Sequence, residues 1–96
     1  MMIIVSYDIS VLDKNGAKRL RQVAKLCQNY GQRVQNSVFE CIVDYQTFLM
    51  LKKNILQVVD LKKDSVRFYL LGNNFKGKIE HYGTKETIDL TSTLIF

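Results

Sequence analysis

The chain has 96 residues, of which 47% are hydrophobic, so it predicts one small globular domain spanning residues 1–96 and excludes a disordered protein. Fourteen Lys and Arg residues against nine Asp and Glu residues give a formal net charge of +5, which favours an anionic partner such as nucleic acid. No basic region precedes the first apolar stretch and no apolar segment is long enough to span a bilayer, so we expect neither a secretory signal nor a membrane partner. Cys27 and Cys41 lack metal-ligand spacing and are expected to be buried thiols of a cytoplasmic protein.

The first half of the chain predicts a strand, a helix and a divided strand. Residues 2–9 form an almost wholly apolar, β-branched run, which is typical of a buried strand and presents one acid, Asp8, near its end. Residues 15–30 carry apolar side chains at three- and four-residue intervals, which predicts a helix that the following glycine ends. Residues 32–44 indicate strand, and a bend near Asn36 could divide it into two.

The second half adds one helix, two strands and a tail. Residues 46–59 predict a helix with an apolar stripe, residues 65–71 a strand, and residues 78–82 one more short strand. Residues 84–96 form a tail with much apolar surface, which we expect to dock on its own domain, on the partner subunit or on a partner protein.

This order of elements predicts an α+β fold of the ferredoxin-like, split βαβ kind, with an antiparallel sheet, two helices on one face and a short C-terminal strand. The predicted strands are apolar on both sides, so the face without helices needs a cover. A second copy of the chain would supply it, which predicts a homodimer formed through the sheet face.

A row of cations marks the first predicted helix. They recur at spacings of four, three and four, and therefore share one narrow sector of the helix: Lys14, Lys18, Arg21 and Lys25. Arg19 lies off this row and Arg33 lies just after the helix, and both are assigned to the same phosphate-binding surface. Neutralisation of a phosphate backbone would offset the repulsion within the row, whereas the alternative is an ordinary solvated helix face.

Asp8 is the candidate for metal binding and catalysis, since a carboxylate at the end of a core strand is held by a rigid element. Mg²⁺ or Mn²⁺ would polarise a phosphodiester, and Mg²⁺ usually takes one or two carboxylates. One Asp8 per chain makes a weak site, but two copies facing each other across a two-fold axis make a plausible one. Without metal, one of the two close acids should hold a proton more readily, and Tyr7 and Ser10 could supply hydroxyls nearby. The alternative is that Asp8 only caps the following loop.

Three stretches together resemble the CRISPR-associated protein 2 family: residues 3–9 with their terminal acid, the basic residues 18–24, and residues 31–41 with the order Arg-x-Gln-x-Ser-Val-Phe-Glu. The resemblance covers essentially the whole chain. The Cys-Gln-Asn-Tyr-Gly segment and the Leu-Ile-Phe end are similar to the subtype I-C branch.

The resemblance implies a symmetric homodimer with Asp8 as the metal-binding acid at its interface, and a Mg²⁺-dependent endonuclease that acts on RNA or on double-stranded DNA. It also implies a bridge between dimers of the partner integrase during spacer acquisition. Arg33, Ser37 and Phe39 match the family pattern and join the nucleic-acid-binding candidates, although Phe39 could instead be a core aromatic. A non-catalytic DNA scaffold and a small-ligand regulatory module remain the alternatives to a nuclease.

Overall fold

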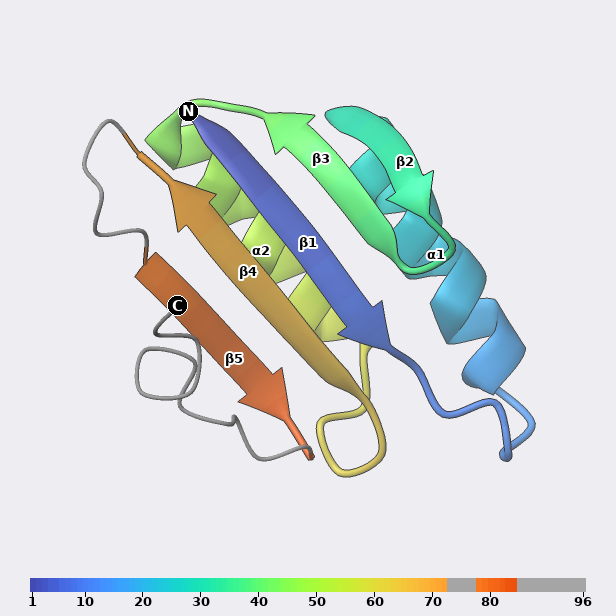
Figure 1. Ribbon diagram of the computed structural model, residues 1–96. Helices are drawn as coiled ribbons and strands as arrows, with labels where there is room; N and C mark the ends of the chain where they lie inside the picture. Colours follow the sequence, from blue (N-terminus) through green and yellow to red (C-terminus); the bar gives the residue numbers. More distant parts are fainter. Residues whose placement is uncertain (73–77, 85–96) are drawn as a thin grey trace, which may run out of the picture.

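The computed structural model describes residues 1–72 and 78–84 (Figure 1). Two helices and five strands follow one another along the chain as β1 (Met2–Asp8), α1 (Gly16–Gln28), β2 (Gly31–Gln35), β3 (Val38–Ile42), α2 (Tyr45–Val58), β4 (Ser65–Leu71) and β5 (Lys78–Gly83). The predicted tail lies outside the described residues, apart from its first residue.

One five-stranded sheet has the order β2-β3-β1-β4-β5, and every neighbouring pair is antiparallel. Both helices cover the same face: α1 lies behind β2 and β3, and α2 behind β1 and β4 (Figure 1). The predicted ferredoxin-like fold with an added C-terminal strand is therefore confirmed.

The expected division of the second strand is also confirmed, since a turn at residues 36–37 separates β2 from β3 and the register shifts between Arg33 and Gln35. The role predicted for Gly31 was wrong. Among the described residues only Gly83 has a positive φ, so Gly31 does not end α1 in the left-handed conformation. A side chain at Gly31 would instead collide with the backbone of Glu40 and Cys41, which explains why glycine stands where β2 begins.

The core lies between the sheet and the two helices. Alternate strand residues point into it, as the two-residue period of a strand requires. Its fully buried members come from both layers: Ile3, Val5, Val23, Cys27, Phe39, Cys41, Phe48, Leu51, Ile55 and Phe68. The two cysteines are free and buried, as predicted, and burial raises the pKa of the Cys27 thiol to about 12.

The opposite face of the sheet carries no helix, and apolar side chains are exposed on four of its strands: Met2, Ile42, Leu71 and Ile79. Three of them lie next to one another, because Met2 pairs with both Ile42 and Leu71, while Ile79 pairs with Tyr69 of β4. We call this the open face. His81 lies on it beside Arg67, is half-buried, and has no hydrogen-bond partner for either ring nitrogen among the described residues. Neither described helix is long and apolar enough to cross a membrane.

Candidate functional site

Asp8 is the last residue of β1, and its side chain is exposed. Since Ile3, Val5 and Tyr7 point into the core, the alternation of the strand places Asp8 on the open face. Asp8 pairs with Ser65 of β4, and the seven residues after it lead to α1 at the same end of the sheet (Figure 1). A rigid core strand therefore presents this carboxylate on the surface that a second copy is predicted to cover.

A metal ion at Asp8 would need ligands from outside one chain. Within residues 1–72 and 78–84, no group of three or more His, Cys, Asp or Glu side chains is placed to hold a metal. A single exposed carboxylate still suits Mg²⁺, which keeps several waters and takes one or two carboxylates. One Asp8 therefore fits the predicted metal as a single ligand, and a second copy of the chain could add a second carboxylate.

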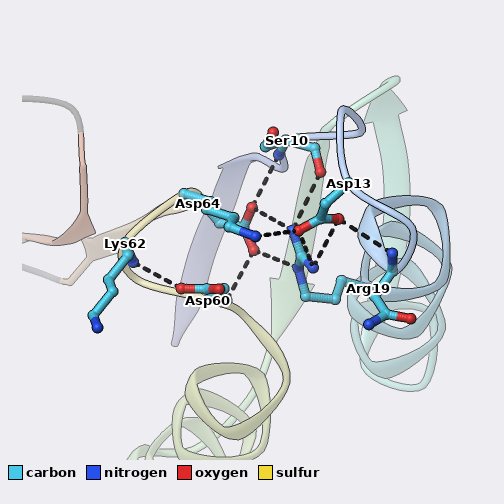
Figure 2. Close-up of polar contacts among 8 residues, drawn as sticks. Ser10, Asp13, Arg19, Asp60, Lys62 and Asp64 are labelled. Carbon is cyan, nitrogen blue, oxygen red and sulfur yellow. Dashed lines mark hydrogen bonds and ion pairs between the residues drawn. The ribbon is translucent and has the colours of Figure 1, made fainter.

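Sequence reasoning missed a buried carboxylate beside this site. Asp64, directly before β4, is fully buried and accepts hydrogen bonds from the backbone N–H of Ser10 at 2.9 Å and of Asp60 at 2.8 Å (Figure 2). It also accepts from Arg19 Nε at 2.8 Å and Nη2 at 3.2 Å. Burial acts to raise the pKa of Asp64, but these donors outweigh it, so the pKa lies below its ordinary value and the acid stays charged.

Arg19 is the first correction to the predicted nucleic-acid contacts. The residue is 8% exposed, and its guanidinium pairs with Asp64 at 2.8 Å and with Asp13 at 3.1 Å, and donates to the backbone oxygen of Ser10 at 3.2 Å (Figure 2). Its place off the cationic row turns it toward the loop between β1 and α1. Arg19 therefore ties that loop to the start of β4 and does not face a phosphate.

Phe39 is the second correction. Its ring is fully buried in the core and stacks on Tyr7 with a centroid distance of 6.3 Å, so it cannot stack on a base. The alternative, a core aromatic, is confirmed. Arg33 lies over the same ring, with its guanidinium carbon 5.2 Å from the centroid.

Tyr7 is the third correction, because it does not flank Asp8 as a hydroxyl donor. It points to the opposite face of the sheet and is 4% exposed. Burial raises the pKa of its hydroxyl and Cys27 adds to this, while the charge of Arg33 and a hydrogen bond from its guanidinium act in the opposite direction.

The remaining cations stay at the surface. Lys14, in the turn before α1, and Lys18, Arg21 and Lys25, on the helix, are all exposed, and the first turn of α1 holds no acid. The fold also brings Arg33 and Ser37 to this region, since a cavity of about 640 Å³ opens between α1 and the β2–β3 hairpin and is lined by Arg21, Lys25, Arg33 and Ser37 among others. We call it the hairpin cavity. Arg21 and Lys25 of α1 and Arg33 of β2 thus form one cationic surface.

Comparison with known proteins identifies the family of the chain. The family model described as CRISPR associated protein Cas2 matches residues 1–79. The chain belongs to the Cas2 family. The CRISPR-associated endonuclease Cas2 of Halalkalibacterium halodurans is 55% identical over 96 residues, covering 100% of both chains. The CRISPR-associated endoribonuclease Cas2 of Chlorobaculum tepidum is 52% identical over 95 residues, covering 99% of both.

Among solved structures, that of Streptococcus pyogenes Cas2 at pH 6.5 is similar, with a TM-score of 0.70 and 55% sequence identity. The match covers 79% of this chain and 92% of that one. The predicted family and its fold are therefore confirmed. The hints at the finer subtype fall partly on residues 94–96, which lie outside the described residues.

Proposed function

We propose that this Cas2 chain is a metal-dependent endonuclease that cleaves phosphodiester bonds of RNA or DNA and acts with the partner integrase in CRISPR spacer acquisition. The observation that carries the proposal is the exposed carboxylate of Asp8 at the end of a core strand, on the apolar open face. Full-length relatives named endonuclease and endoribonuclease support the chemistry.

The proposed active form is a homodimer that buries the two open faces against each other. Adjacent strands expose apolar residues such as Met2, Ile42 and Leu71. Burial of this surface would stabilise a self-complementary two-fold contact between two copies. Such a contact would bring two Asp8 carboxylates to one site. Mg²⁺, or Mn²⁺ in its place, would act there as a Lewis acid toward the scissile phosphate.

The cationic surface would hold the strand that is cut. Lys18, Arg21 and Lys25 project from one side of α1, Lys14 lies in the turn before it, and Arg33 and Ser37 extend this surface across the hairpin. A cationic surface of this kind binds backbone phosphates, which are common to RNA and DNA and carry no sequence information. Both nucleic acids are therefore possible substrates. The two cysteines are buried and form no disulfide, which is consistent with a protein that acts in the reducing cytoplasm. Within the family, we place the chain in the subtype I-C branch.

The test compares Asp8→Asn with a matched control, Asp44→Asn. Asp44 is an exposed acid that caps α2 by accepting from the Thr47 N–H at 2.7 Å, and Asn retains that capping ability. We expect Asp8→Asn to lose cleavage of labelled RNA and DNA in Mg²⁺, the wild type to lose it on chelation, and Asp44→Asn to retain it. Undiminished cleavage by Asp8→Asn would overturn the catalytic assignment.

The second candidate is a non-catalytic scaffold in which the cationic dimer holds a DNA duplex for the integrase. The exposed, acid-free row on α1 favours it, since binding needs these charges and no metal. The two candidates separate cleanly: the scaffold predicts that Asp8→Asn supports spacer acquisition as well as the wild type does. Its predicted integrase contact through residues 84–96 is tested by truncation after Leu90, which should abolish association with the integrase but leave DNA binding intact.

A further inference from the structure

The hairpin cavity has the composition of a site for an anion with an apolar body. Arg21 and Lys25 reach it from α1 and Arg33 from β2, so three cations from two elements converge on it. Leu20 and Ala24 add apolar wall on the helix side. Its volume of about 640 Å³ lies in the range of small-molecule pockets and exceeds what an inorganic anion fills.

A buried hydroxyl whose proton has no acceptor faces this cavity. Tyr7 lines it and is 4% exposed, and its O–H has no acceptor among the described residues, while Arg33 can donate to its oxygen. A buried donor without an acceptor costs free energy, so such groups call for an explanation. A ligand oxygen that accepts a hydrogen bond from Tyr7 would supply the missing partner.

The lining is held in place before any ligand binds. Tyr7 donates its backbone N–H to the backbone oxygen of Ser37 at 3.0 Å, which fixes the hairpin turn against β1. The Arg33 guanidinium rests over the Phe39 ring at 5.2 Å, and Tyr7 stacks on that same ring. Arg33 is therefore kept near the Tyr7 hydroxyl, and a preorganised arginine loses less conformational freedom on binding.

We propose that the hairpin cavity binds one nucleoside monophosphate unit, with the phosphate among Arg21, Lys25, Arg33 and the Tyr7 hydroxyl and the nucleoside along Leu20 and Ala24. Three cations select a phosphate, while the apolar wall and the volume select a ligand that carries a nucleoside. The unit is either a free nucleotide or the phosphorylated end of a strand.

This inference rests on the proposed binding of nucleic acid by the same surface, but it adds a discrete pocket to it. The cavity is lined by Tyr7, which points to the face of the sheet opposite Asp8, so it is separate from the proposed metal site. A second copy on the open face would leave the cavity accessible. Asp8→Asn should therefore keep the binding described here even where it abolishes cleavage.

The test is an amide NMR titration of the full chain with adenosine monophosphate. We expect shifts concentrated in residues 20–28 and 31–38, and a dissociation constant about tenfold weaker in Tyr7→Phe, which deletes only the hydroxyl. Tyr45→Phe, which removes an exposed hydroxyl on α2, should bind as the wild type does. Arg33→Gln should also weaken binding, and Lys53→Gln, an exposed charge on α2, should not.

The second arm separates the two sources of the ligand. A short single strand with a terminal phosphate is compared with the same strand ending in a hydroxyl, and Tyr7→Phe should remove any preference for the phosphate. If Tyr7→Phe changes neither the affinity for adenosine monophosphate nor the preference for the phosphorylated strand, the proposed pocket is wrong. Salt-dependent binding and cleavage of the strand would in that case still uphold the proposed function.

Discussion

Two acids at one end of the sheet have opposite surroundings. Asp8 ends β1 and is exposed on the open face, whereas Asp64 precedes the residue that pairs with it and is fully buried. Asp64 accepts two backbone N–H groups and two bonds from Arg19, which keep it charged out of water. Burial beside a cation thus makes Asp64 part of the folded framework, while exposure at the end of a strand gives Asp8 the access to solvent that the proposed metal site requires.

The largest effect should come from removing the buried acid. Asp64→Ala leaves Arg19 buried with Asp13 as its one acidic partner among the residues that the structure describes, and it deprives the backbone N–H groups of Ser10 and Asp60 of their acceptor. We expect the free energy of unfolding to fall by about 3 kcal/mol, measured by urea denaturation. A loss as small as that of an ordinary surface substitution would show that the pair does not hold the loop.

A second effect should appear on acidification. Lys63 at 2.8 Å is the largest influence on Asp13, burial opposes it, and Arg19 assists, so the pKa of Asp13 falls to about 2. A lowered folded-state pKa gives stability that is complete above the ordinary value near 4 and is lost as the pH falls toward about 2. Asp13→Asn should flatten the stability profile over that window, as followed by urea denaturation at stepped pH. An unchanged slope would mean that other carboxylates carry the acid sensitivity.

The smallest effect on stability should come from the exposed acid. We expect Asp8→Asn to change the free energy of unfolding by less than about 0.5 kcal/mol, because surface substitutions usually fall in that range. The same denaturation experiment checks it. A loss comparable to that of Asp64→Ala would mean that Asp8 belongs to the scaffold, as the loop-capping alternative holds.

Much of this molecule could be predicted from local sequence. Periods of two and of three to four residues predicted both helices and the strands β1 and β4, a possible bend near Asn36 allowed for the division of β2 from β3, and the motif around residues 31–41 led to the family, which the comparison confirmed. The alternation of β1 also indicates that Tyr7 and Asp8 point to opposite faces, which rules out the hydroxyl that Tyr7 could have supplied beside Asp8.

The error at Arg19 arose because its contact joins distant parts of the chain. Arg19 and Asp64 are 45 positions apart, so no local pattern paired them. One signal was available: Arg19 lies off the exposed row and thus toward the interior, and a buried arginine requires an acid. The hairpin cavity was likewise hidden, since it needs residues of α1 and β2 side by side.

The central claim, that two Asp8 side chains share one metal ion, is tested most directly by the stoichiometry of Mn²⁺ binding. Titration of the full chain, followed by electron paramagnetic resonance, should give one ion for every two chains, and Asp8→Asn should abolish that binding. One ion for each chain, or binding that Asp8→Asn leaves unchanged, would contradict the account.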